Sequence, residues 1–369
     1  MIIAHQDLHR DIAELKLRLQ QEGFYEKPER LILLGWTYNI ALVLGGLSAF
    51  VFLSPWWLRI PGILASSAGL LGISTHAHTA SHGASSDRKW LNEFLLHLGF
   101  PFFLQISARY WHHSHIQIHH PHPNVVGVDD DCDLQPFFAL NERDLEQRGP
   151  WRRLYHRWQG LLLPVVLGLN AFNVQRAGWK FLLRELRDPA RRTRAHWVDL
   201  AVTSSHILVW VLLPMFFFPP WKVLAVYVLR VGLMGYAAFA AFASAHFPAE
   251  AVCLTDAARA RSDFYFRQAV ASVNFRTGFF GDMACNGVQF QIEHHIWPHI
   301  NHLHYRRLSP LMRAFCQKHG MPYRTLGWGE ALWKSYKVFF QPKPVLTDIE
   351  PLRLDAPSRE SAFPSPSTP

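Results

Sequence analysis

The feature that most constrains this chain is a run of twenty-three uncharged, mostly apolar residues from Leu31 to Leu53. A helix rises about 1.5 Å per residue, so about twenty residues cross the roughly 30 Å hydrocarbon core of a bilayer. Within that core a helix satisfies every main-chain polar group internally. The run therefore predicts a transmembrane helix.

Three further apolar runs follow, from Ile60 to Ala77, from Trp197 to Phe218 and from Val223 to Ala245. The short turns between the first and second runs, and between the third and fourth, contain the Pro and Trp expected at a bilayer interface. We therefore predict an all-α integral membrane protein with four transmembrane helices in two hairpins, residues 31–77 and 197–245.

Two hairpins leave the remaining segments on one side of the membrane. The formal net charge of +9 alone would fit nucleic acid, anionic lipid or an acidic partner. The distribution of this charge decides between them, because residues 78–196 are rich in arginine, whereas the turns Ser54–Trp57 and Phe218–Trp221 hold no charge. The positive-inside rule then places residues 78–196 and 246–341 in a helical cytoplasmic cap. We expect the bacterial inner membrane, or the endoplasmic reticulum of a eukaryote, and no nucleic acid partner.

Residues 1–30 have no apolar signal core and predict an amphipathic helix that lies on the protein or on the membrane. One face of this helix carries four apolar side chains: Leu8, Ile12, Leu15 and Leu19. Two apolar stretches, Leu95–Ile106 and Leu161–Val174, are too short or too interrupted by Pro to span, which indicates interfacial helices. Residues 342–369 are rich in Pro and Ser and predict a disordered tail.

Histidine is concentrated in three places that the predicted topology brings to one membrane face. Residues four apart on a helix lie on the same side, so the pairs in the first two clusters can each reach one metal ion. The clusters are His78 and His82 in H-T-A-S-H, His115, His119 and His120 in H-I-Q-I-H-H, and His294 and His295 in Q-I-E-H-H.

Seven or more imidazoles exceed the four ligands of one tetrahedral zinc ion and imply two metals. The clusters contain no thiolate, which leaves iron, zinc and copper as metals that imidazole suits. The chain lacks both H-E-x-x-H and E-x-x-H, which excludes the common zinc protease and the carboxylate-bridged di-iron bundle. Asp129, Asp131 and Asp133 alternate as in a calcium loop, but Leu134 and Leu140 occupy the positions of the required Gly and Glu.

The three clusters resemble the histidine boxes of the membrane fatty acid desaturase and hydroxylase superfamily, over roughly His78–Tyr323. The motifs Q-I-E-H-H-I-W-P and H-P-N-V-V-G-V-D-D-D-C-D are most similar to those of front-end acyl desaturases. Those enzymes insert a double bond between the carboxyl end of an acyl chain and an existing double bond.

The resemblance implies a set of metal ligands, namely His78, His82, His115, His119, His120, His246, His294 and His295. Gln291 replaces a histidine that other branches use, so a water or an amide would complete that site. The three residues between His115 and His119 suggest a bacterial or acyl-lipid branch. Asp129, Asp131 and Asp133 either orient ligand imidazoles or form a solvated acidic loop.

An unactivated methylene C–H bond requires a redox metal and O2, and iron has the redox chemistry that zinc lacks. We therefore expect two iron ions, O2 as co-substrate and an acyl chain carried on lipid, coenzyme A or a carrier protein. With only about thirty residues before the first span, the electron donor is expected to be a separate ferredoxin or cytochrome b5 type protein. A lipid hydroxylase is the main alternative, and a membrane metal or haem transporter is a second.

Overall fold

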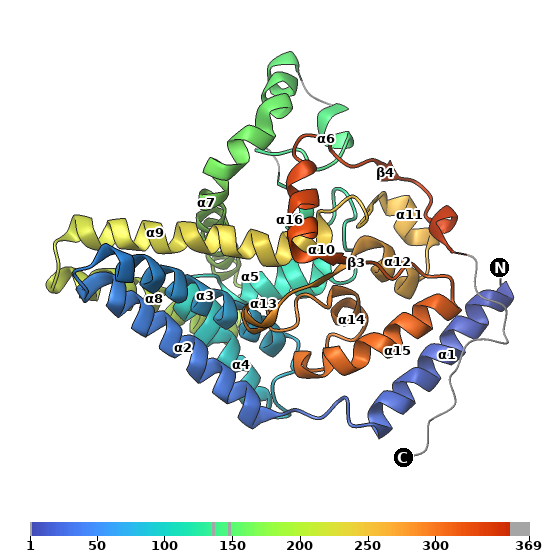
Figure 1. The fold of residues 1–369 in the computed structure, drawn as a ribbon, viewed down its shortest axis with the longest axis horizontal. Coiled ribbons are helices and arrows are strands. Elements are labelled where there is room, and N and C mark those ends of the chain that lie inside the picture. The colour runs from blue at the N-terminus through green and yellow to red at the C-terminus, as the bar shows by residue number, and fades with distance from the viewer. Residues whose placement is uncertain (1, 135–136, 147–148, 355–369) are drawn as a thin grey trace.

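The computed structural model describes residues 2–134, 137–146 and 149–354. Four of its helices are long and apolar enough to cross a membrane, which confirms the four predicted spans by length and composition. They extend together toward the left of Figure 1. The spans are α2 (Glu29–Phe52), α3 (Trp56–Ser81), α8 (Arg194–Ile207) continued through η4 (Leu208–Leu212) and η5 (Leu213–Phe216), and α9 (Pro220–Ala238) continued through η6 (Phe239–Ala243) and α10 (Ser244–His246).

Helices α2 and α3 pack backbone to backbone because small residues face each other along their contact. A Cβ atom on Gly46 would lie 2.4 Å from the carbonyl oxygen of Gly62, and one on Gly72 would lie 2.0 Å from the Asn39 side chain. Van der Waals contact of this kind drives association of membrane helices, where burial of apolar surface contributes little.

The stretch predicted as an interfacial helix at 95–106 is instead buried. It belongs to α4 (Lys89–His97) and the π-helical η1 (Leu98–Leu104), and Phe100 is fully buried against the spans. The close approach is possible because Gly99 lies against Ala77 of α3. The prediction of an interfacial helix fails here because the π-helical turn accommodates Pro101 without ending the helix.

The helical segment ends at Gln105, which adopts a left-handed conformation with φ of 58°. Side chains from neighbouring helices satisfy the carbonyl groups freed there, as a buried helix end requires. His206 and Trp210 donate to the Phe102 oxygen at 2.7 and 3.1 Å, and Arg230 donates to the Phe103 oxygen at 3.0 Å. His206 thus makes a helix–helix hydrogen bond.

Beyond this break the chain forms α5 (Ala108–Trp111) and the π-helical η2 (His112–His119), which carry the second histidine box. Asp199 of α8 caps the start of α5. Its buried carboxylate accepts hydrogen bonds from the Ser107 hydroxyl at 2.6 Å and from the main-chain N–H groups of Ala108 and Arg109 at 3.0 Å. One span therefore fixes the position of the box.

Replacing Asp199 with alanine is expected to lower the stability of the purified protein by about 2–3 kcal/mol, because it leaves buried N–H donors without an acceptor. Thermal unfolding in detergent measures this loss. Asp188, which follows the end of α7 (Pro150–Arg187) and has 45% of its side chain exposed, provides the matched control: its alanine variant should unfold within about 0.5 kcal/mol of the unmodified chain. Equal melting curves for the two variants would contradict the capping role.

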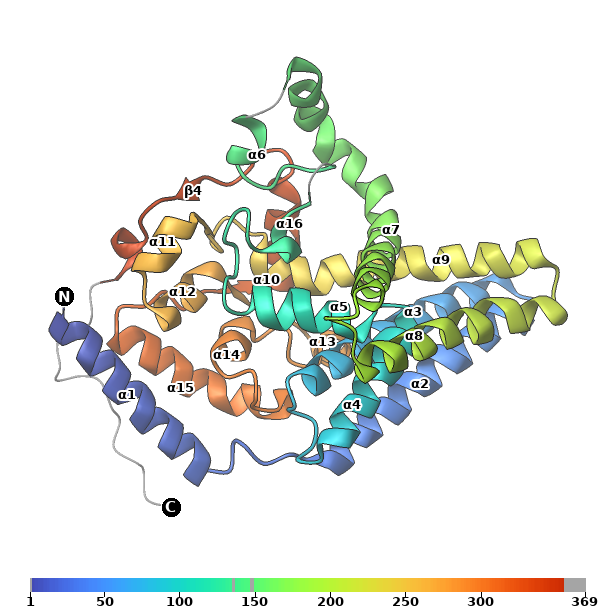
Figure 2. The same ribbon diagram turned by 180° about the vertical axis from the view of Figure 1, so that it is seen from behind.

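The remaining elements form a globular part at the other end of the spans, which packs around α14 (Figures 1 and 2). The helices whose bounds have not yet been given are α1 (Ile2–Gln21), η3 (Asp130–Cys132), α6 (Arg143–Glu146), α7 (Pro150–Arg187), α11 (Asp256–Arg261), α12 (Phe264–Ala271), α13 (Phe279–Cys285), α14 (Gln291–Ile296), η7 (His302–His304), α15 (Tyr305–Lys318), α16 (Trp328–Lys337) and η8 (Glu350–Leu352).

The prediction of an all-α protein needs one correction, because the globular part contains four short strands. Strand β1 (Cys253–Leu254) pairs in parallel with β4 (Val345–Leu346), and β2 (Asn274–Arg276) pairs in parallel with β3 (Thr325–Gly327). They occur where connecting segments run side by side in the interior, since buried main-chain groups must find partners. Two or three residues are too few to produce a strand pattern in the sequence.

The N-terminal helix α1 lies beside α15 in both views, on the protein itself. Three of its four predicted apolar residues, Leu8, Ile12 and Leu19, are buried in the core of the globular part. Asp11 on the same face forms an ion pair with Lys318, with 2.5 Å between oxygen and nitrogen, and lies 3.0 Å from His319 Nε2.

Residues 161–174 lie in the middle of α7, a helix much longer than predicted, which accommodates Pro164. One side of α7 packs against α9 and against Phe340, whereas Trp151, Trp158, Leu161 and Val165 are exposed. The exposed apolar side is what an interfacial helix needs, so that interpretation stays a prediction.

The prediction of a disordered tail is wrong for residues 342–354. Strand β4 pairs with β1, Ile349 is buried in the core, and the Arg353 guanidinium lies over the Phe266 ring at 4.1 Å. Polar and proline-rich composition hid this order, because the segment is held by partners far away in the sequence rather than by its own periodicity. The last fifteen residues of the predicted tail, 355–369, lie outside the part of the chain described here.

Candidate metal centre

The first histidine box lies at the end of a span. Helix α3 continues past the predicted boundary at Ala77, so His78 belongs to its last turn and His82 follows its end. Both side chains are buried. His246 has the corresponding position in α10, at the end of the fourth span.

The second box lies on a π-helical turn, and this geometry determines which rings meet. The His120 N–H bonds to the carbonyl of His115, five residues earlier, at 3.0 Å. An α-helix turns about 100° per residue and would separate these two rings by 140° around its axis. The wider π turn brings the His115 and His120 rings together, while the His119 ring stacks on His115 at 5.1 Å and also lies beside His246 and His295.

The third box lies on α14, where neighbouring residues again point in different directions. His294 and His295 are both buried, and their ring centroids lie 5.6 Å apart with the planes at 81°. Adjacent histidines can therefore serve two separate metal ions.

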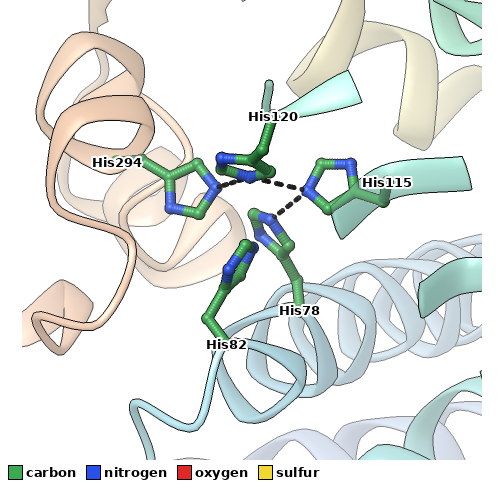
Figure 3. A group of neighbouring side chains, drawn as sticks. All are labelled: His78, His82, His115, His120 and His294. Atoms are coloured by element: carbon green, nitrogen blue, oxygen red, sulfur yellow. Dashed lines mark hydrogen bonds between the residues drawn. The ribbon is translucent and has the colours of Figure 1, made fainter. Parts of the chain in front are cut away.

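Five imidazoles from all three boxes converge on one point (Figure 3). One nitrogen of each ring lies within 4.8 Å of those of the others, and the closest Nε2 atoms, of His78 and His115, are 2.8 Å apart. We call this set the five-imidazole group: His78, His82, His115, His120 and His294.

A second group lies directly beside the first and contains His119, His246 and His295, with nitrogen atoms again within 4.8 Å of one another. The Nε2 atoms of His246 and His295 are 3.2 Å apart. We call this set the three-imidazole group. The side-chain amide of Gln291 reaches it, with its nitrogen 2.9 Å from His246 Nε2, and its buried oxygen has no partner among the described residues.

Hydrogen bonds on the outer side of the rings fix which nitrogen carries the proton. His119 and His115 donate from Nδ1 to the carboxylates of Asp129 and Asp131, at 2.9 and 3.2 Å. His246 faces the Ala271 carbonyl in the same way at 3.2 Å. A carboxylate and a carbonyl can only accept, so each of these rings presents an unprotonated Nε2 to the interior of its group.

Burial also keeps most of the rings uncharged. It lowers the pKa of these imidazoles well below its ordinary value, and repulsion from neighbouring rings lowers the pKa further. This applies to five rings outside the spans: His82, His115, His120, His294 and His295. His119 differs, because the Asp129 carboxylate outweighs burial and raises its pKa.

Several unprotonated ring nitrogens therefore lie within 4.8 Å of one another in a buried site, and a cation between them would relieve the repulsion of their lone pairs. The donor sets fit two metal ions, one in each group. All eight histidines that the resemblance indicated take part, while their role as ligands stays a prediction.

The acidic turn behaves in three different ways. Asp129 is buried beside His119, and Asp131, about one-third exposed, accepts from His115. Both side chains can therefore orient imidazole rings, which is the first of the two alternatives predicted from the sequence. Asp133 is exposed at the end of η3 and accords with the alternative of a solvated loop.

The structure adds supporting residues that the motifs did not identify. The Gln268 oxygen accepts from His295 Nδ1 at 2.9 Å while its nitrogen donates to the His120 carbonyl at 2.8 Å. Tyr305 lies 3.2 Å from His294 Nδ1. Asn124 donates to the His246 carbonyl at 3.1 Å. Only the position of Asn124 in H-P-H-P-N, close to the second box, was a signal in the sequence.

Comparison with known proteins agrees with this geometry. A model of the fatty acid desaturase family matches residues 54–327, a range that contains every histidine of both groups. The chain is 26% identical over 347 residues to the Delta(8)-fatty-acid desaturase 2 of Arabidopsis thaliana, covering 88% of this chain and 73% of that protein. It is 23% identical over 348 residues to a Delta(5) fatty acid desaturase of Caenorhabditis elegans, covering 90% and 73%. For a Delta(8)-fatty-acid desaturase of Euglena gracilis the identity is 27% over 326 residues, covering 83% and 75%.

Proposed function

The chain belongs to the fatty acid desaturase family, and from that premise we propose that it is a membrane-bound, O2-dependent fatty acyl desaturase with two iron ions. The observation that carries the proposal is the convergence of eight buried imidazoles into two neighbouring groups. A family match alone does not specify a metal site, whereas the eight imidazoles provide ligands for two metal ions.

The five-imidazole group would hold one ion. The three-imidazole group would hold the other, with the Gln291 amide oxygen or a water as a further ligand. The five-imidazole group exceeds the four ligands of a tetrahedral zinc ion. When bound, the irons would supply the reduction of O2 to an oxidant that breaks an unactivated C–H bond.

The reaction removes two hydrogen atoms from adjacent methylene groups, and with two external electrons and two protons it converts O2 into two water molecules. The protein would position the acyl chain at the metals and exclude water from the site. His78 and His246 stand in the final turns of two spans, so an acyl chain lying along the spans would meet the metals without leaving an apolar environment. We propose that both hairpins cross the bilayer and that the site faces the cytoplasm.

The Delta(5) and Delta(8) names of the relatives support a front-end activity on a chain that already carries a double bond. We propose a fatty acyl substrate on lipid, coenzyme A or a carrier protein, and a separate acidic electron donor of the ferredoxin or cytochrome b5 type. The arginine-rich surface of residues 78–196 complements an acidic donor and anionic lipid headgroups.

Expression of the chain in a host of known lipid composition tests the proposal, with mass spectrometry of the host's acyl chains as the readout. We expect a product lighter than its precursor by two hydrogen atoms, with the new double bond on the carboxyl side of the old one. A product heavier by one oxygen atom would instead identify a hydroxylase. Unchanged acyl chains in cells that accumulate the iron-loaded protein and its donor would overturn the proposed function.

A further inference from the structure

Lys343 lies in the C-terminal segment whose sequence resembles a disordered tail, yet its side chain is buried beside the candidate metal centre. Only 4% of the residue is exposed. Its ammonium donates to the carbonyl oxygens of His246 and Ala251, at 2.9 and 2.7 Å. Burying an ammonium group costs several kcal/mol unless its donors are satisfied, so an apolar side chain would be less costly at a position that needs only packing.

The two carbonyl groups that Lys343 contacts also accept hydrogen bonds from Asn124. The Asn124 amide donates to the oxygens of His246 and Ala251, at 3.1 and 3.3 Å. Its main-chain N–H bonds to Asp129 at 2.8 Å, and Asp129 accepts from His119. Lys343 and Asn124 therefore belong to one network that reaches two members of the three-imidazole group.

The charge of Lys343 also suits its position. His246 ends the fourth span, and the carbonyl groups at the end of a helix carry partial negative charge and lack partners within the helix. A cation there stabilises the last turn, from which the His246 ring projects. The ammonium acts through the main chain, since its hydrogen bond is to the carbonyl oxygen of His246.

The segment around Lys343 is built to hold it in place. Pro342 and Pro344 flank it, and a residue before proline favours extended backbone. The Lys343 N–H donates to Leu140 at 2.9 Å and its carbonyl accepts from Glu142 at 3.0 Å. Strand β4 then continues into the pairing with β1.

We propose that Lys343 is a positioning residue for the three-imidazole group, and that the C-terminal segment is a working part of the metal centre. Its ammonium fixes the end of the fourth span so that His246 meets His119 and His295 at the distance a metal requires. His246 belongs to the three-imidazole group and not to the five-imidazole group, so the effect of Lys343 is expected at one of the two metal ions. This inference rests on the proposed function for the presence of a metal.

The test is the binding of Fe(II) to the purified full-length chain carrying Lys343→Met, which keeps the length of the side chain and removes its donors. Lys337→Met, at an exposed position six residues earlier, is the matched control. We expect two irons per chain in the control. In K343M one iron should bind about 10- to 100-fold more weakly, as when a residue that orients a ligand is removed.

Mössbauer spectroscopy with 57Fe identifies which ion is affected. One of two iron signals should weaken in K343M, and a His246→Ala variant should weaken the same signal. Two irons held by K343M as firmly as by K337M would overturn the proposal, and so would equal loss of both signals. If K343M does not fold, K343Q, which keeps an amide donor, is judged by the same two criteria. A K337M control that binds no iron would instead contradict the proposed metal function.

Discussion

Replacing His115 with alanine is expected to abolish desaturase activity, with at least about a 100-fold loss, and to remove one iron from the purified protein. Loss of a residue that only supports a ligand costs 10- to 100-fold in metal affinity or activity, and His115 is itself within the five-imidazole group. Its Nε2 atom lies 2.8 and 3.2 Å from those of His78 and His120, so its removal opens the centre of that group. Iron quantification and acyl-chain analysis on the same preparation measure both effects.

The control for this variant lies two residues earlier on the same turn. His113 stacks on Phe181 at 5.1 Å and bonds to Gln117, away from both groups. The His113→Ala protein should keep its iron and at least half of its activity. An active, fully iron-loaded H115A protein would show that the close approach of the imidazoles has no metal-binding role.

Replacing Asp129 with asparagine is expected to weaken iron binding at the three-imidazole group by about 10- to 100-fold. Burial opposes ionisation of Asp129, but the neighbouring His119 ring and hydrogen bonds from His119 and Asn124 hold its pKa below the ordinary value. The carboxylate is therefore charged at neutral pH. It keeps the His119 proton on Nδ1 and makes Nε2 a stronger ligand, which a neutral amide cannot do as well.

Asp131→Asn is the matched comparison, because Asp131 makes the equivalent contact with His115. That contact is longer, 3.2 against 2.9 Å, and Asp131 is about one-third exposed whereas the Asp129 side chain is fully buried. Water can replace the Asp131 interaction, so D131N should weaken iron binding less than D129N in the same Fe(II) titration. Equal affinities for D129N and the unmodified chain would mean that the buried carboxylate supports only the fold.

Much of the fold and the site was predictable from the sequence because both depend on local pattern. An uninterrupted apolar run, as at Leu31–Leu53, predicts a membrane-spanning helix because the thickness of the bilayer sets the length and the apolar composition of the segment. The histidine boxes are equally local, and the four-residue spacing of His78 and His82 fits one metal on the helix that forms there. His115 and His119 of the second box also lie close enough to share a metal ion, together with Asp131, but each belongs in addition to a different group of imidazoles.

What only the tertiary structure decided is the division of the imidazoles and the set of residues that hold them. The partition of His119 and His120 depends on a π-helical turn, and the side chains of Asp199 and Lys343 act on parts of the chain about ninety residues away. Apolar periodicity records whether a segment is buried, but it does not record what it is buried against. The sequence by itself therefore determined that the chain has helices long and apolar enough to cross a membrane and that it gathers histidines. The division of the rings into groups, and the contact of the apparent tail with one of them, follow only from contacts between distant segments.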